Sequence, residues 1–249
     1  MDLKYWLGYL SEWLGVVAVV MIAGVSPLLK KVRRIDFRYP RREATYALSL
    51  FAVSFLIAFQ YFSNSFFDFL KNLSGYFGGT ELAQRMVLAL ACLILFIAAL
   101  LLRGQPLKSI GWGRANMKAG LTTGFLAVVL VIFLRGKFST LLHGVSSEQG
   151  TLLLVWLLLA IAEETIFRGY IQLRLDSYFG SKWGWLAAAA LYMLWQLPGR
   201  LWMLSFAEMW PTLLIALAQA LLLGWMMRKS GHVAAPILYR AVAGWLLLI

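Results

Sequence analysis

The sequence predicts an all-α, polytopic membrane protein with about eight transmembrane helices. Hydrophobic residues make up 61% of the 249 residues, charged residues only 14%, and the mean hydropathy is +0.76. The apolar residues form long blocks and do not recur with the 3.6-residue period of a surface helix. A helix needs about 20 apolar residues to cross a hydrocarbon core, so these blocks are typical of membrane spans and not of a soluble domain.

The blocks can be placed in order along the chain. We expect helices at about 8–28, 44–63, 83–102, 117–134, 150–170, 183–199, 207–227 and 232–249. No internal repeat or low-complexity segment divides them, so we expect one integral membrane domain over residues 1–249. Within it, residues 1–149 form variable helices and residues 150–249 a core that holds the charged motifs. The amino terminus lacks the basic region and cleavage site of a signal peptide, so the first helix is expected to stay as an anchor.

Positive charge gathers in the odd-numbered connections between these helices. The basic residues there are Lys30, Lys31, Arg33, Arg34, Arg38, Arg41 and Arg42, then Arg103, Lys108, Arg114 and Lys118, then Arg168, Arg174 and Lys182, and finally Arg228 and Lys229. The even connections hold fewer: Lys71, Arg85, Arg135, Lys137 and Arg200. The positive-inside rule therefore places the odd connections in the cytoplasm and both termini on the other side of a bacterial-type plasma membrane. The net charge of +12 has this origin, so we expect membrane lipids and no nucleic acid as partners.

Two carboxylates and an arginine end the apolar run 151–161. An ionised side chain at bilayer depth costs at least about 2.5 kcal/mol, so it needs a partner or a task. Glu164 and Arg168 stand four residues apart on one helix face, and an intrahelical ion pair is their ordinary interpretation. Glu163 has no such local partner. It is therefore a candidate general base, or it pairs with a cation on another helix.

Residues 163–169 read Glu-Glu-Thr-Ile-Phe-Arg-Gly and resemble the EExxxRG signature of the CPBP family, the intramembrane CAAX proteases and bacteriocin-processing or self-immunity (Abi) proteins. Residues 189–198 fall where that family has its FxxxH motif, and residues 230–244 where it has HxxxN. The resemblance implies an all-helical membrane bundle with a conical cavity. It also implies that Glu163 activates water, that Glu164 and Arg168 belong to the same motif, and that two His and an Asn polarise the scissile carbonyl.

The chain departs from the family pattern at three of these positions. Gln196 stands at the first His position, Arg240 at the second and Gly244 at the Asn position, while Tyr192 replaces the usual Phe. Gln and Arg donate hydrogen bonds but cannot shuttle a proton near neutral pH. Arg240 also needs a counter-ion in the middle of the last helix, and Glu163 is the expected one. We therefore expect an active site converted into a structural or ligand-binding ion pair.

The remaining candidate ligands support no metal site or cofactor. The two histidines, His143 and His232, lie far apart in the sequence and Cys92 is the single cysteine, whereas a zinc site needs three or four converging ligands. Tyr192 and Trp195 are expected to line the cavity. A bound lipid or another apolar ligand there stays an open alternative to simple packing.

Three function classes remain open from the sequence. The first, which we favour, is a non-proteolytic CPBP-like protein that binds a partner membrane protein or an apolar ligand in the former active-site cavity. The second is an active intramembrane endopeptidase that uses Glu163 as general base on prenylated or hydrophobic peptides. The third is an accessory subunit of a membrane complex or a small transporter. Whether the chain is an enzyme is left open between a pseudoenzyme and a CAAX-type endopeptidase.

Overall fold

Long apolar segments that begin at polar capping residues form the helices of this protein. The computed structural model describes residues 3–26, 29, 32, 35–63 and 67–249, and within these residues every regular element is a helix. The elements are α1 (Leu3–Val25), α3 (Pro40–Ser63), α4 (Asp68–Gly75), α5 (Glu81–Leu102), η2 (Leu107–Ile110), α6 (Arg114–Leu134), α7 (Phe138–Leu142), α8 (Ser147–Glu164), η3 (Thr165–Gln172), α9 (Leu173–Phe179), α10 (Ser181–Trp195), α11 (Leu197–Met203), α12 (Phe206–Ser230) and α13 (Ala234–Trp245). Of the basic residues counted above, Lys30, Lys31, Arg33 and Arg34 lie outside the described residues.

Side-chain caps fix where several long helices begin. The hydroxyl of Thr80 accepts a hydrogen bond from the Ala83 N–H at the start of α5. Capping boxes start α8 and α12, where Ser146 and Ser205 exchange hydrogen bonds with residues three positions later. Such caps satisfy backbone N–H groups that have no partner within the helix. The sequence therefore sets the start of α8, and with it the depth at which the acidic pair lies.

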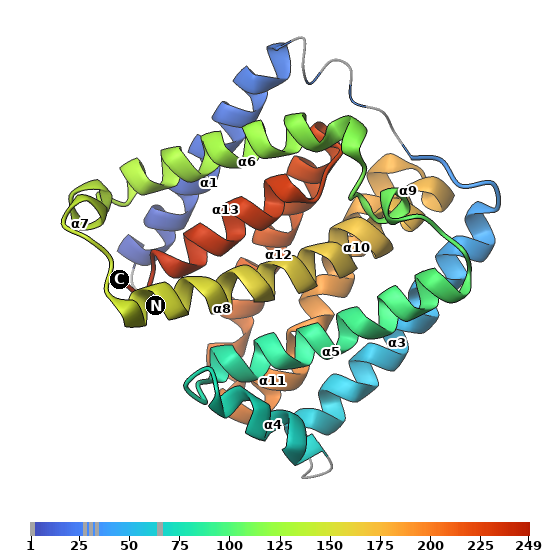
Figure 1. Cartoon of the computed structure of the whole chain (residues 1–249), viewed down its shortest axis with the longest axis horizontal. Coiled ribbons are helices and arrows are strands. Elements are labelled where there is room, and N and C mark those ends of the chain that lie inside the picture. The colour runs from blue at the N-terminus through green and yellow to red at the C-terminus, as the bar shows by residue number, and fades with distance from the viewer. Residues whose placement is uncertain (1–2, 27–28, 30–31, 33–34, 64–66) are drawn as a thin grey trace.

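The helices pack side by side with α8 in the middle. α8 contacts α5 on one side and α13 on the other, and α13 also contacts α6. Figure 1 shows these four helices next to one another, with α3 beyond α5 and with α1 and α12 behind them. Both chain ends lie at the end of the bundle that carries α7. The centre of the bundle is thus the place where α8 and α13, the helices with the predicted charged motifs, face each other.

The predicted all-helical membrane fold is confirmed, but the count of eight spanning helices is not. Among the described residues, six segments are long and apolar enough to cross a membrane: Gly8–Val25, Pro40–Ser63, Glu81–Leu102, Leu107–Leu134, Ser147–Phe179 and Phe206–Ser230. α10 has 15 residues and α13 has 12, so each reaches only about 18 to 23 Å, short of a hydrocarbon core. α10 ends at Trp195 because a new helix with a proline in its first turn begins at Leu197.

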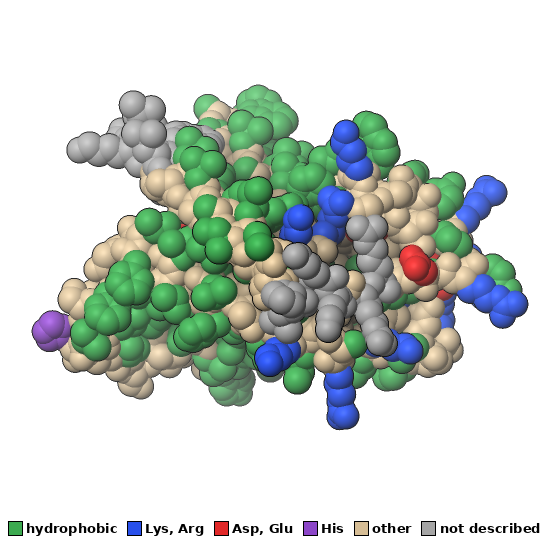
Figure 2. Space-filling model, turned by 90° about the horizontal axis from the view of Figure 1, so that it is seen from above, with side chains coloured by type: hydrophobic (Ala, Val, Ile, Leu, Met, Phe, Trp, Pro, Cys, Tyr) green, Lys and Arg blue, Asp and Glu red, His purple; other side chains and the backbone are tan. Residues whose placement is uncertain are grey.

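The surface separates apolar and basic side chains. Hydrophobic side chains cover much of the face in Figure 2, while Lys and Arg gather towards one end. Exposed residues at the basic end include Arg38, Arg41, Arg42, Lys108 and Arg114, which come from the first and third connections of the sequence analysis. The surface is therefore that of a multi-pass membrane protein, with exposed apolar residues suited to lipid tails.

Two of the basic residues that charge counting places in connections are instead paired with a buried carboxylate, and one of them, Arg174, is itself buried. Arg174 is fully buried, and its Nε lies 3.0 Å from Oε2 of Glu43, which is also buried. Arg103 forms a second, short ion pair with Glu43, and Gln105 donates to Glu43 at 2.9 Å and accepts from Arg174 at 2.6 Å. This network joins the start of α3 to the end of α5 and to α9. Arg174 therefore links α9 to α3 through a buried ion pair. Its interpretation as a basic residue of a connecting loop was wrong.

A second buried polar contact begins α13. Gly231 ends α12 with a φ of +65°, a conformation that glycine adopts without strain. The next residue, His232, is only 2% exposed and accepts the Ala234 N–H on its Nδ1 at 3.0 Å, with the Trp112 ring edge-on to it. Accepting that bond requires an unprotonated Nδ1. The neutral imidazole thus caps the short helix that carries Arg240.

Replacing Glu43 by Gln should destabilise the protein by about 3 to 5 kcal/mol, because it leaves the buried Arg174 without its carboxylate. Thermal or denaturant unfolding of the purified protein in detergent measures the change. Glu148→Gln is the matched control, since Glu148 is exposed and should cost less than about 1 kcal/mol. Equal stabilities of the two variants would contradict the role of the network.

The stability of the protein should fall as the pH is lowered through about 6.5. Burial lowers the pKa of His232 below the ordinary value of about 6.5 for a histidine, so the unfolded chain takes up a proton before the folded chain does. The contribution is therefore present above pH 6.5 and is lost at lower pH, by at most about 1.4 kcal/mol per pH unit. In unfolding measured between pH 7.5 and 5.5, His232→Asn should flatten this dependence, whereas His143→Asn, at an exposed residue, should leave it unchanged.

Candidate functional site

The acidic pair lies where α8 changes into a π-helical segment. Glu163 and Glu164 are the last residues of α8, and η3 continues the same helix with the wider π-helical turn. π-Helical segments are rare in proteins, and those that occur are often found at functional sites. Gly169 permits the close approach of η3 to η2, because a Cβ at this position would lie 2.3 Å from the carbonyl oxygen of Ile110. The backbone at the motif is therefore shaped by a packing contact as well as by the motif itself.

Both oxygens of the Glu163 carboxylate are occupied. Tyr192 donates its hydroxyl to Oε2 at 3.0 Å, and Trp195 donates its indole N–H to Oε1 at 3.2 Å. Arg240 donates to Oε2 as well, in a short contact. The Glu163 side chain is only 1% exposed. The structure thus brings four predicted residues, Glu163, Tyr192, Trp195 and Arg240, into one cluster.

Arg240 bridges the two glutamates. One of its terminal nitrogens contacts Glu163, and the other lies 2.7 Å from Oε1 of Glu164. Arg168 approaches the same Glu164 carboxylate, with its Nε 3.0 Å from Oε2, which is the i,i+4 pair expected from the sequence. We expected Glu163 alone as counter-ion of Arg240, and the structure adds Glu164. Two guanidinium groups and two carboxylates, all buried, thus balance one another's charge.

Tyr192 does more in this cluster than fill the volume of the Phe that the family pattern has there. Its hydroxyl binds Glu163, and its ring lies under the guanidinium groups of Arg168 and Arg240, at 4.4 and 5.2 Å from the ring centroid. A cation over an aromatic face gains about 0.5 to 2 kcal/mol. The exchange of the usual Phe for Tyr192 therefore changes the chemistry of the cluster as well as its packing. The added hydroxyl supplies one of the hydrogen bonds that occupy the carboxylate.

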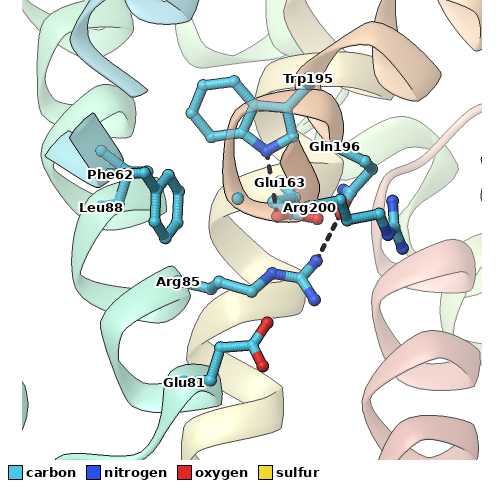
Figure 3. Close-up of a pocket in the computed structure, with 9 residues that line it drawn as sticks. Phe62, Glu81, Arg85, Leu88, Glu163, Trp195, Gln196 and Arg200 are labelled. Atoms are coloured by element: carbon cyan, nitrogen blue, oxygen red, sulfur yellow. Dashed lines mark hydrogen bonds between the residues drawn. The ribbon is translucent and has the colours of Figure 1, made fainter. Parts of the chain in front are cut away.

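Gln196 lies beside the cluster but turns to a different partner. Its Oε1 accepts a hydrogen bond from Arg85 at 2.6 Å, and its buried Nε2 has no hydrogen-bond partner among the described residues. Gln196 follows the last residue of α10, so its position depends on the helix end and not on the interior of a span. Arg85 and Arg200 adjoin it (Figure 3). From the sequence, both arginines are only basic residues of the even-numbered connections between helices. Nothing in their spacing predicts that they lie beside Gln196.

Gly244 is the position where the structure leaves no room for the side chain of the family pattern. A Cβ on Gly244 would lie 2.5 Å from the Trp156 ring. Trp156 belongs to α8 and packs against buried hydrophobic residues of α13. The space of a side chain at this position is therefore taken by an indole, and the close packing of α8 on α13 depends on this glycine.

Two adjacent cavities surround these residues. One of about 40 Å³, drawn in Figure 3, is lined by Glu163, Trp195, Gln196 and Arg200 among others. It has room for a few water molecules. A second cavity, of about 200 Å³, shares Gln196 and Arg200 with the first and reaches Arg240 and Gly244. The predicted cavity-lining role of Trp195 and Tyr192 fits these positions, since each lines one of the two.

The other candidate ligands lie apart from this cluster. His143 is exposed at the end of α7, His232 is buried at the start of α13, and Cys92 is buried in α5. Among the residues that the structure describes, no group of three or more His, Cys, Asp or Glu side chains is placed to hold a metal ion. The buried polar groups around the acidic pair are arginines, a glutamine, a tyrosine and a tryptophan, and none of these is a usual zinc ligand.

The helical bundle and the buried EExxxR cluster define a class of multi-pass membrane protein related to intramembrane proteases. Residues 145–246 match the family described as Type II CAAX prenyl endopeptidase Rce1-like. The matched segment contains Glu163, Glu164, Arg168, Tyr192, Trp195, Gln196 and Arg240, so this part of the chain is similar to the Rce1-like branch of the CPBP family, as the motifs indicate. No curated protein and no solved structure gives a significant match to the chain.

Replacing Arg240 by Leu should destabilise the protein by about 3 to 5 kcal/mol, because it leaves the buried Glu163 carboxylate without a counter-ion. Unfolding in detergent measures the effect. The double variant Glu163→Gln, Arg240→Leu removes the stranded charge and should recover part of the loss. An Arg240→Leu protein as stable as the parent would contradict the ion-pair role.

Proposed function

We propose that this chain is a non-proteolytic member of its family that uses the former active-site cavity for binding. One observation carries the proposal. Arg240, at the position of the second family histidine, occupies both carboxylates of the acidic pair. A general base needs a free lone pair directed at water within hydrogen-bond reach. Glu163 instead accepts from a guanidinium, a phenol and an indole.

The other two changed positions support the same proposal. The side-chain carbonyl oxygen of Gln196 accepts a hydrogen bond from Arg85. An amide also cannot transfer a proton to a leaving amine near neutral pH. At Gly244 the asparagine of the family pattern would meet Trp156. At each of these two positions a neighbouring residue fits the changed side chain: Arg85 binds Gln196, and the Trp156 ring fills the space beside Gly244. Such mutual adjustment is expected of a site that has settled into a new role, and not of a proteolytic site with one lost group.

The binding partner in this proposal is an apolar or amphipathic ligand, or a segment of another membrane protein. Aromatic side chains and aliphatic residues line the cavities together with the arginines, so an occupant with both apolar and polar parts fits them. We further propose a plasma-membrane location with the basic end of the bundle in the cytoplasm. The distribution of Lys and Arg along the chain supports this orientation.

An active endopeptidase is the alternative function. It is favoured by the small cavity that reaches Glu163, which could hold a water molecule, and by the free Nε2 of Gln196, which could donate to a developing oxyanion. In this alternative Glu163 would have to exchange its bond with Arg240 for one with water during each turnover. The retained acidic pair and Arg168 also fit it.

A cleavage assay distinguishes the two functions. The purified protein is incubated with a panel of prenylated and unprenylated peptides beside a Glu163→Gln variant, with an active CAAX endopeptidase as positive control. We expect no cleavage by either protein, because Glu163 is not free to activate water. Unfolding measurements check that the two proteins are folded. Cleavage by the parent that is lost in Glu163→Gln would overturn the proposal and establish a glutamate-dependent protease.

A further inference from the structure

The second feature of the cavities is an excess of unpaired hydrogen-bond donors. Gln196 is 6% exposed, and among the residues that the structure describes its Nε2 and the Nη1 of Arg200 are buried without a hydrogen-bond partner. Arg85 donates to Oε1 of Gln196, which fixes the amide so that its NH₂ group is the unused end. A buried donor without a partner costs about 1 to 3 kcal/mol. These two unpaired donors line the same cavity as Arg85, so they favour an acceptor from outside the protein.

The charges around this point include both signs, and the two without an ion pair among the described residues that lie nearest Gln196 are positive. The cavities are lined by four arginines and three glutamates: Arg85, Arg135, Arg200, Arg240, Glu12, Glu81 and Glu163. Arg135 is paired with Glu12, and Arg240 with Glu163. Of the charged groups left, Arg85 and Arg200 have no ion pair within 4.0 Å among the described residues. The exposed Glu81 lines the same cavity, and its carboxylate faces Arg85 (Figure 3) without forming such a pair.

The proximity of the two free arginines has an electrostatic consequence. Burial and the charge of Arg85 lower the pKa of Arg200 to about 10, which still leaves Arg200 charged at neutral pH. Two like charges held close together repel each other unless an anion lies between them. A guanidinium binds oxyanions through two parallel N–H groups, so a pair of them with an amide donor suits a phosphate group.

The surroundings indicate what carries the phosphate. The cavity of about 40 Å³ is too small for more than an anionic group, but it adjoins Phe62, Leu88 and Trp195 and the larger cavity of about 200 Å³. Apolar residues next to a cationic recess inside a membrane bundle fit the headgroup and the first part of the chains of an amphiphile. A free phosphate ion would use only the recess.

We infer that Arg85, Gln196 and Arg200 form a binding site for a phosphate group, carried by an anionic lipid, at the cavity beside Glu163. The inference rests on the proposed function, because it names the ligand of the same cavity. Glu163 has no part in holding the ligand, since its oxygens are acceptors and already occupied. The residue at the first family His position has thus become a donor to an anion.

Titrations of the detergent-solubilised full chain, followed by thermal unfolding at constant ionic strength, test the site. The probes are a short-chain phosphatidic acid, the matching diacylglycerol without the phosphate, and inorganic phosphate. We expect a saturable rise in Tm with phosphatidic acid and none with diacylglycerol. A rise with inorganic phosphate only at higher concentrations identifies the lipid as the source. Equal effects of phosphatidic acid and diacylglycerol, or a phosphate ion that binds as tightly as the lipid, would overturn the lipid site.

Variants locate the effect at these residues. Arg200→Gln and Arg85→Gln should each raise the Kd for phosphatidic acid at least about tenfold, because a charge-assisted hydrogen bond is lost, and Arg200→Lys should recover part of the affinity. Arg114→Gln, at an exposed arginine of the basic end, is the matched control and should not change the Kd. Unchanged binding in both cavity variants would overturn the site. Peptide cleavage in the assay above would refute the proposed function separately, whatever the lipid titration gives.

Discussion

The contact of the Arg240 guanidinium with Glu163 and Glu164 is the interaction on which the centre of this structure depends. A charge buried in a helical bundle is tolerated only with a partner. Here one cation on α13 forms ion pairs with two anions on α8. The contact fixes how the last helix lies against α8. It also determines what the acidic pair can do, because the same bonds that stabilise the carboxylates withdraw them from water.

The neighbours of this contact are adjusted to it. Tyr192 adds a hydroxyl bond to Glu163 and an aromatic face beneath two guanidinium groups. Trp156 packs where a side chain on Gly244 would stand, so α8 and α13 approach closely at the level of the ion pair. A proteolytic site of this family would need mobile protons and space for a peptide. The arrangement found here provides packed aromatic rings and permanently charged donors, which suit binding more than proton transfer.

Two further ion networks, which lie away from this centre, stabilise the bundle. Glu43 joins α3, the end of α5 and α9 through Arg103 and Arg174, and Glu12 joins α1 to α6 and α13 through Arg135 and Tyr239. Helices in a membrane gain little from apolar contact with one another, because lipid tails are equally apolar. Buried polar ties between helices therefore contribute much of the specificity of the packing. Within the described part of the chain they leave Arg85 and Arg200 as the cavity's cations without an ion pair.

The sequence alone determined that the chain is a helical membrane protein, because long apolar blocks allow few other structures, and the order of its motifs identified the family of residues 145–246. It also indicated that Arg240 needs a counter-ion. Only the tertiary structure decided that Glu164 shares this cation, that Arg174 is buried and that Arg85 meets Gln196 and Arg200. The hydrogen bonds among these contacts join residues 76 to 131 positions apart, and Gln196 stands at a helix end that periodicity does not fix. The lengths of α10 and α13 likewise depend on turns and packing, which hydropathy does not record.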